Sequence, residues 1–324
     1  MTQESFDSLA AYYSDPTNNL RWQLVFTLPD WLEVWWGSFG AGAEKYLIVV
    51  RRDEKILGIA PLHISDGTAS IIGSTEVCDY LDFVVAEGVE KEFFGALLDD
   101  LEKKGVKRLV LAPLRPDSAA HAILLPLAEE RGYRGELCLL EDVSVDMDLP
   151  AGWEEYLAML DGKQRHEIKR KLGKLDKSGN NVSYSVVKGR DEVRTAMDTF
   201  LKLFSISRQD KAEFMTPQME SFFRSMVDAM AGAGVLKLGV LGLNGQPAAM
   251  VMYFDYNDCI YLYNSGYNPD YSSLSVGLIS KVLCIKHAIS TGRKKFDFLK
   301  GAESYKYYLG GKEIPLYRCQ ITLS

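Results

Sequence analysis

The sequence has few cysteines and no long apolar run. Its five cysteines are scattered and form no Cys-x-x-Cys pair. We therefore expect no disulfide framework and no bound metal. This cysteine usage fits a reducing compartment. The first residues lack the basic start and apolar run of a secretory signal, and no stretch approaches the roughly 20 apolar residues of a membrane-spanning helix. We expect a cytoplasmic protein that does not cross the membrane; peripheral contact with its surface stays open.

The chain is also short of positive charge. Its net charge of −7 argues against broad nucleic-acid binding, although one local basic segment exists. With 47% hydrophobic and 25% charged residues, the composition is that of an ordinary globular protein. A length of 324 residues suits two domains, which we place at 1–150 and 151–324.

Two runs of predicted elements share one order: a hairpin, a strand, a helix and a further strand. The first run comprises 46–52, 56–64, 80–86, 90–104 and 105–113; the second comprises 235–243, 247–254, 259–267, 273–291 and 292–300. Asn244 and Gly245 tolerate positive φ and favour the second hairpin turn. We infer a tandem duplication of a mixed α/β unit, with a mostly helical segment, 151–233, between the copies.

A hairpin, a strand, a helix and another strand form the core of the GNAT acyltransferase fold, and two such units resemble the Fem-like tandem GNAT proteins. The motifs Tyr263-Asn-Ser-Gly-Tyr, Ser275-Val-Gly-Leu and Phe296-Asp-Phe-Leu-Lys-Gly-Ala-Glu-Ser-Tyr-Lys306 are similar to those of CelD-like acetyltransferases of cellulose and other polysaccharide biosynthesis. The resemblance implies an α/β fold of two tandem GNAT-like domains with a helical insertion, the second domain being the acyltransferase.

The start of the predicted helix at 273–291 departs from that resemblance. GNAT enzymes that bind acyl-CoA usually carry Arg/Gln-x-x-Gly-x-Gly/Ala there, whereas residues 271–277 contain a single glycine, Gly277. Fem-like relatives take their acyl group from aminoacyl-tRNA instead. The acyl donor is therefore left open between acyl-CoA and aminoacyl-tRNA.

Asp297 interrupts an otherwise apolar strand. Alternation places Phe296 and Phe298 on one face of the sheet and Asp297 on the other, and the matching position in the first half is Val110. A buried carboxylate is costly unless it is paired. Two interpretations follow: a structural salt bridge, to Lys306 or to a basic helix, or a substrate-amine ligand or general base.

Three polar residues follow this strand: Glu303, Tyr305 and Lys306. The tyrosine hydroxyl could protonate a leaving group, and the lysine could bind a phosphate or an oxyanion. The alternative is that these residues only pack a short helix over the sheet. We count Asp297, Glu303, Tyr305 and Lys306 as candidate catalytic residues.

The start of the second long helix is a candidate donor site. Free backbone N–H groups and the helix dipole suit a pyrophosphate there, and Gly277 would let the backbone approach a ligand closely. The candidate cofactor-binding residues are Ser272, Ser273, Ser275, Val276, Gly277 and Leu278. Serines cap helices widely, so this pattern alone also fits a plain helix start.

The segment 163–177 is a predicted basic helix, which is either a solvated face or a dock for an anionic substrate. The neighbouring Trp153 and Tyr156 could stack on a sugar or base. Asp79 and Asp82 either line a substrate cleft or end a strand. The candidate substrate-binding residues are Lys163, Arg165, Lys169, Arg170, Asp79, Asp82 and Tyr263.

From these features we expect a GNAT-type N-acyltransferase. It would move an acyl group from acyl-CoA, its co-substrate, to an amine of a small or lipid-linked precursor of the cell envelope or of a polysaccharide. One alternative is a Fem-like ligase that uses aminoacyl-tRNA, and another is a non-catalytic tandem GNAT protein that binds an envelope precursor or a protein. No stable nucleic-acid partner is expected.

Overall fold

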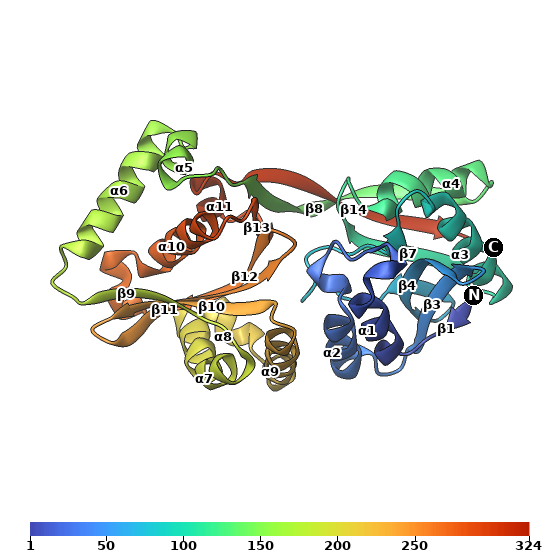
Figure 1. Ribbon diagram of the computed structural model, residues 1–324, viewed down its shortest axis with the longest axis horizontal. Coiled ribbons are helices and arrows are strands. Elements are labelled where there is room, and N and C mark those ends of the chain that lie inside the picture. Colours follow the sequence, from blue (N-terminus) through green and yellow to red (C-terminus); the bar gives the residue numbers. More distant parts are fainter. Residues whose placement is uncertain (324) are drawn as a thin grey trace. The chain divides into compact units, whose positions relative to one another are not determined.

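The computed structural model describes residues 1–323, except for the side chain of Glu141. The chain forms two compact units. Unit 1 comprises Met1–Ser144 and the segment that begins at Ile314, and unit 2 comprises Val145–Glu313 (Figure 1). The sequence placed the division after residue 150; the compact units divide after Ser144, and the final strand returns to unit 1.

Unit 1 contains a mixed sheet in the order β1-β3-β4-β5-β7-β14, with β6 paired to β4 and β2 paired to β6. The strands are β1 (Thr2–Gln3), β2 (Leu20–Arg21), β3 (Glu44–Arg52), β4 (Lys55–Ser65), β5 (Thr68–Ile71), β6 (Val84–Ala86), β7 (Arg108–Leu114) and β14 (Lys312–Thr322). The helices are α1 (Phe6–Ser14), α2 (Pro29–Phe39), α3 (Glu90–Lys103) and α4 (Leu125–Glu130), with the short turns η1 (Pro16–Asn18), η2 (Val25–Thr27) and η3 (Ala120–Leu124).

Unit 2 repeats that order, read from its far edge, as β9-β10-β11-β12-β13-β8, so β12 and β13 correspond to β5 and β7. Its strands are β8 (Arg134–Asp148), which enters from unit 1, β9 (Val182–Val187), β10 (Leu236–Leu243), β11 (Gln246–Tyr256), β12 (Cys259–Tyr267) and β13 (Lys295–Lys300). Its helices are α5 (Trp153–Met159), α6 (Gly162–Asp176), α7 (Arg190–Ser207), α8 (Gln209–Phe214), α9 (Pro217–Gly232), α10 (Val276–Ser290) and α11 (Ser304–Tyr308), with the turn η4 (Pro269–Leu274).

The helices of unit 2 cover both faces of its sheet, with α7 and α9 on one face and α10 on the other (Figure 1). On α7, Val193, Met197, Phe200 and Phe204 recur every three or four residues, so one face is apolar, and all four are buried. Helix α6 begins at a capping box in which Asp161 accepts from the backbone N–H of Gln164 and the Gln164 side chain accepts in return.

The structure confirms the predicted mixed α/β fold and shows the same strand order twice. The turn between β10 and β11 has Asn244 at φ 52° and Gly245 at φ 78°, as that hairpin requires. One predicted strand is wrong: of residues 80–86, only Val84–Ala86 form a strand, β6. The strand that pairs in parallel with β7 is β5, which the sequence analysis missed.

The two parallel ladders correspond residue by residue. In unit 1, β5 and β7 pair Thr68 with Arg108, Ala69 with Leu109 and Ser70 with Val110. In unit 2, β12 and β13 pair Cys259 with Lys295, Ile260 with Phe296 and Tyr261 with Asp297. Val110 and Asp297 therefore occupy the same third register, as the repeat in the sequence had indicated.

Within residues 1–323, no helix is both long enough and apolar enough to span a membrane.

Candidate functional site

The sheet of unit 2 splits between two neighbouring strands. The parallel ladder of β12 and β13 ends at Tyr261 and Asp297, although β12 runs on to Tyr267 and β13 to Lys300. Strand β12 stays paired with β11 through an irregularity between Met252 and Tyr253. Beyond this register the two strands are no longer paired with each other, and we call their unpaired ends the split.

Asp297 lies at the point where the split begins. Its side chain is 1% exposed, and Oδ1 accepts a hydrogen bond of 2.8 Å from the backbone N–H of Leu299. Leu299 has φ 64°, a conformation that is unfavourable for a leucine, and this bond stabilises the turn. Burial and the Asp297 charge together raise the pKa values of Cys259 and Tyr261. Asp297 is therefore a buried carboxylate whose charge affects the pKa values of neighbouring side chains.

Lys306 fixes the end of β13. Its side chain is 2% exposed, and its ammonium donates to the carbonyl oxygens of Leu299 (3.1 Å) and Lys300 (2.6 Å) and pairs with Glu303 at 2.9 Å. These contacts use three donors, so they favour a structural role over binding of a phosphate in this conformation. The turn from Asp297 to Lys306 is thus held by its own polar side chains.

Lys281 is a residue that the sequence analysis did not recognise as functional. It lies on α10, is 7% exposed, and its ammonium donates to the Gly277 carbonyl at 2.8 Å. The same ammonium lies 4.9 Å from the ring centroid of Tyr305, one of the predicted catalytic residues. Burial, with the nearby charge of Lys211, lowers the pKa of Lys281 to about 7.

Lys211, on α8, is the second lysine that was missed. Its ammonium donates to the carbonyl of Ser265 on β12 and lies 4.7 Å from the ring centroid of Phe204. Burial, with the charge of Arg208, lowers the pKa of Lys211 to about 8. The only sequence signal for Lys281 was its position within an apolar helical run. The sequence around Lys211 contains no such signal.

The predicted donor site and the basic helix lie together. Lys171 of α6 donates to the Ser275 hydroxyl at 2.8 Å, and Lys174 donates to the carbonyl of Ser273 at 2.8 Å. Ser275 is the residue before α10 and has φ 56°. In the described chain, no backbone carbonyl accepts from the N–H groups of Val276 and Gly277. Two ammonium groups therefore lie beside the free N–H groups that begin α10.

The other basic residues of α6 differ in their contacts. Arg170 binds Glu167 through two hydrogen bonds of 2.6 and 2.5 Å, and Lys169 pairs with Glu154 at 3.6 Å. Lys163 is exposed and Arg165 is half-buried, and neither forms an ion pair with any described residue. The ion pairs to Glu167 hold the pKa of that carboxyl at about 2. Part of this basic face is thus already neutralised.

Two predictions about side chains near this site need correction. Tyr156 is 1% exposed and donates to the carbonyl of Leu309 at 3.0 Å, so the prediction that it stacks on a ligand is wrong. A Cβ on Gly277 would lie 2.8 Å from the ring of Tyr267. The missing side chain at Gly277 thus makes room for an aromatic ring of β12, rather than for a ligand.

The remaining candidates lie elsewhere. Tyr263, on β12, packs between the rings of Phe223 (5.9 Å) and Phe254 (5.1 Å). Asp79 and Asp82 belong to unit 1. Asp82 is 9% exposed and accepts from the backbone N–H groups of Ala119 (2.7 Å) and Ala120 (3.1 Å), which supports capping of the turn η3. Their roles in substrate binding stay predictions.

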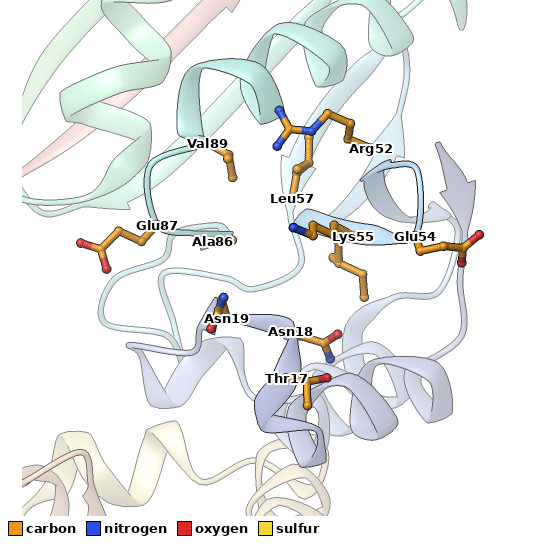
Figure 2. A pocket seen from close by; sticks show the side chains of 11 residues that line it. Thr17, Asn18, Asn19, Arg52, Glu54, Lys55, Leu57, Ala86, Glu87 and Val89 are labelled. Atoms are coloured by element: carbon orange, nitrogen blue, oxygen red, sulfur yellow. The ribbon is translucent and has the colours of Figure 1, made fainter.

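Unit 1 has a hollow of its own, of about 380 Å³, beside the start of α3. Figure 2 shows that Glu54 and Glu87 point away from its centre, whereas Lys55 and Asn19 reach toward it. None of the residues predicted from the sequence as site residues lines this hollow. Among the described side chains of the whole protein, no group of His, Cys, Asp and Glu could hold a metal ion.

Comparison with known families adds a description of this region. Residues 162–307 match the family model described as the acetyltransferase (GNAT) domain. The match begins with α6 and ends within α11, so it contains the basic helix, the start of α10, the split and the Asp297–Lys306 turn. A sequence comparison with curated proteins gives no match.

Three solved structures are similar to at least 85% of the chain. FemX has a TM-score of 0.65 at 14% identity, covering 98% of this chain and 96% of its own. A protein of unknown function from Bacteroides thetaiotaomicron has a TM-score of 0.63 at 14% identity, covering 100% and 99%. The C-terminal domain of a lysylphosphatidylglycerol synthetase from Agrobacterium fabrum, so named provisionally, has a TM-score of 0.56 at 13% identity, covering 85% and 84%. The chain thus has the fold of these proteins, and residues 162–307, within unit 2, are similar to the GNAT acetyltransferase domain.

Proposed function

We propose that the protein is an acyltransferase that moves an acyl group from acyl-CoA to an amine of a cell-envelope or polysaccharide precursor. The observation that carries the proposal is the convergence of Lys171 and Lys174 on the N-terminus of α10. Free backbone N–H groups, the helix dipole and two cations form a suitable place for the phosphates of CoA. The GNAT family match spans this region.

In the proposed reaction, the amine nitrogen attacks the thioester carbonyl and forms a tetrahedral intermediate. The C–S bond then breaks, the CoA thiolate leaves, and the amine loses a proton as the amide forms. Asp297, at the start of the split, is our candidate for the group that orients the amine and accepts this proton. Tyr305, after β13, is our candidate donor to the thiolate.

Aminoacyl-tRNA as the donor is the second candidate. The likeness of the whole chain to FemX concerns the fold, and it is greatest among the three relatives described above. The start of α10 has one glycine, and that glycine packs against Tyr267 instead of facing a ligand. These two observations keep a Fem-like ligase as the alternative, with the same amine chemistry and a different carrier.

Calorimetric titration with CoA tests the donor. We expect the wild-type protein to bind CoA, and the double variant Lys171→Ala, Lys174→Ala to bind at least about tenfold more weakly, because it loses two charge-assisted contacts. Lys163→Ala, an exposed lysine of the same helix, is the matched control and should bind like the wild type.

The outcomes separate the alternatives. No binding of CoA at millimolar concentration would exclude acyl-CoA and make an aminoacyl-tRNA transfer assay the next test. Failure of both assays would leave a protein that binds its partner without catalysis. Equal weakening by the Lys163→Ala control would mean that the whole basic face, rather than the start of α10, holds the ligand.

A further inference from the structure

Two lysines of unit 2, the buried Lys281 and the half-buried Lys211, form no ion pair with a described carboxylate. Lys281 is 7% exposed, and among the residues that the structure describes neither its ammonium nor that of Lys211 pairs with a carboxylate. Each donates to one backbone carbonyl and lies over one aromatic ring. A buried cation without an anion is costly, so this arrangement needs an explanation.

The acidic groups around these lysines are already committed to other cations. Glu303 lies close enough to raise the pKa values of both lysines, but its carboxylate pairs with Lys306 at 2.9 Å. Asp210, which neighbours Lys211, pairs with Arg208 at 2.7 Å. The cluster of Lys211, Lys281, Lys306 and Glu303 therefore carries more positive than negative charge.

The cluster lies along the split. Lys211 binds the carbonyl of Ser265, which belongs to the part of β12 beyond its ladder with β13. Lys306 binds the carbonyls of Leu299 and Lys300, at the separated end of β13. Lys281 binds the carbonyl of Gly277 in the first turn of α10. The excess positive charge thus lies where β12 and β13 stop pairing, close to the first turn of α10.

We propose that Lys211 and Lys281 bind an anionic group, a phosphate or a carboxylate, on the acceptor next to the amine that is acylated. This inference rests on the proposed function above, in which the CoA phosphates occupy the outer start of α10 beside Lys171 and Lys174. Lys211 and Lys281 are then available to bind the acceptor. An anion bound there supplies the missing negative charge and restricts the acceptor to amines with an acidic neighbour.

Binding of an anion by Lys211 and Lys281 should be accompanied by uptake of protons. The charged groups around Lys281 are Lys211 of α8 and Glu303 before α11, together with the thiol of Cys284 on its own helix and the ring of Tyr305. Those around Lys211 are Arg208, Asp210 and Glu303. Because burial and like charge leave both lysines partly neutral near pH 7.5, an entering anion draws protons onto them.

Calorimetry with inorganic phosphate tests the inference without any need for activity. Titrations at pH 7.5 in two buffers of different ionisation enthalpy report the number of protons taken up on binding. They are made on the Lys171→Ala, Lys174→Ala protein, so that the start of α10 does not contribute. We expect proton uptake and at least about tenfold weaker binding after Lys281→Met. Lys286→Met, an exposed lysine of the same helix, is the control.

Lys211→Met gives the second variant in case Lys281→Met does not fold, since Lys211 lies outside the helix α10. Absence of phosphate binding, binding without proton uptake, or unchanged binding in both variants would each overturn the inference. A matched pair of acceptors, glucosamine 6-phosphate and glucosamine, adds a kinetic arm with acetyl-CoA. The variants should raise KM for the phosphorylated amine only. If CoA does not bind, the kinetic arm fails, but the phosphate titration still decides the inference.

Discussion

The two units of the protein share one strand order but differ in where they bury charge. In unit 1, the third register of the parallel ladder holds Val110, whereas in unit 2 it holds Asp297. Helix α3 buries Phe93, Phe94, Leu97, Leu98 and Leu101. Helix α10, its counterpart, buries Lys281 among its apolar residues. The parallel ladder and the long helix thus exist once with apolar residues at these positions and once with buried charges.

The difference supports our proposal that unit 2 carries the chemistry. Unit 1 shows that this sheet and helix need no buried carboxylate or ammonium to pack. A buried charge in unit 2 therefore has a cost that packing alone does not explain. The charges of unit 2 also gather around the split, with Asp297, Lys306, Lys211 and Lys281 each in contact with its strands or with α10. We therefore regard unit 1 as the scaffold and unit 2 as the active unit.

The largest expected effect concerns Asp297. The variant Asp297→Asn keeps an oxygen that can accept from the Leu299 N–H, so we expect the turn and the fold to survive. If the carboxylate accepts the proton of the amine, the variant should lose about 10²–10⁴-fold in kcat/KM, the usual range for a general base. Steady-state kinetics and thermal unfolding, measured together, check this.

The opposite result would assign Asp297 a structural role. In that case Asp297→Asn would turn over normally but unfold more easily, because a buried cation would lose its partner, at a cost of about 3–5 kcal/mol. Val110→Ala, at the equivalent register of unit 1, is the matched control. It should change the stability slightly and the rate not at all, and a large loss of rate would break the division into scaffold and active unit.

The fold was largely readable from the sequence because its elements obey local rules. The strand β12 lies where apolar patterning put it, at Cys259–Tyr267. The equivalence of Val110 and Asp297 also followed from the repeat. Strand β5 was missed because it has only four residues. The next strand, β6, begins only at Val84. Short strands give too little alternation to identify.

The site was harder to predict, because its residues meet only through the fold. Asp297 and Lys306 share one motif, yet the ion pair that forms is between Lys306 and Glu303. Lys211 lies on α8 and Lys281 on α10, and only packing brings each near Tyr305 or Glu303. Sequence patterns mark a lysine as exposed unless the tertiary structure says otherwise. This is why the buried Lys281 and the half-buried Lys211 were not among the predicted residues.

A second prediction uses the buried aspartate of unit 1. Burial raises the pKa of Asp82 to about 6, against the hydrogen bonds from Ala119 and Ala120 that favour its charged form. Between pH 4 and 6 the folded state therefore holds more protons than the unfolded state, so the free energy of unfolding falls as the pH rises. Two pKa units correspond to about 3 kcal/mol.

The variant Asp82→Asn has no charge to desolvate, so it lacks this dependence. Relative to the wild type, it should gain about 3 kcal/mol in the free energy of unfolding as the pH rises from 4 to 7. Urea unfolding at several pH values measures this, and kcat/KM should stay unchanged. A constant difference over the pH range would refute the assignment of Asp82 as a buried acid, and a large loss of rate would place chemistry in unit 1 as well.

The smallest expected effect concerns two surface ion pairs, one in each unit and each near the start of a long helix. In unit 2, Glu167 pairs with Lys171, which lies beside α10; in unit 1, Glu92 pairs with Arg52, which lines the hollow beside α3. Exposed pairs of this kind are worth about 0.2–1 kcal/mol. Glu167→Gln frees Lys171 for a phosphate and should strengthen CoA binding by about two- to fivefold, an effect that added salt removes. Glu92→Gln should leave CoA binding as it is, since the start of α3 is not the proposed donor site.

Calorimetry at low and high salt decides between the units. A similar gain in both variants would mean that both units bind CoA. Unit 1 could then no longer be regarded as a scaffold that takes no part in binding the acyl donor.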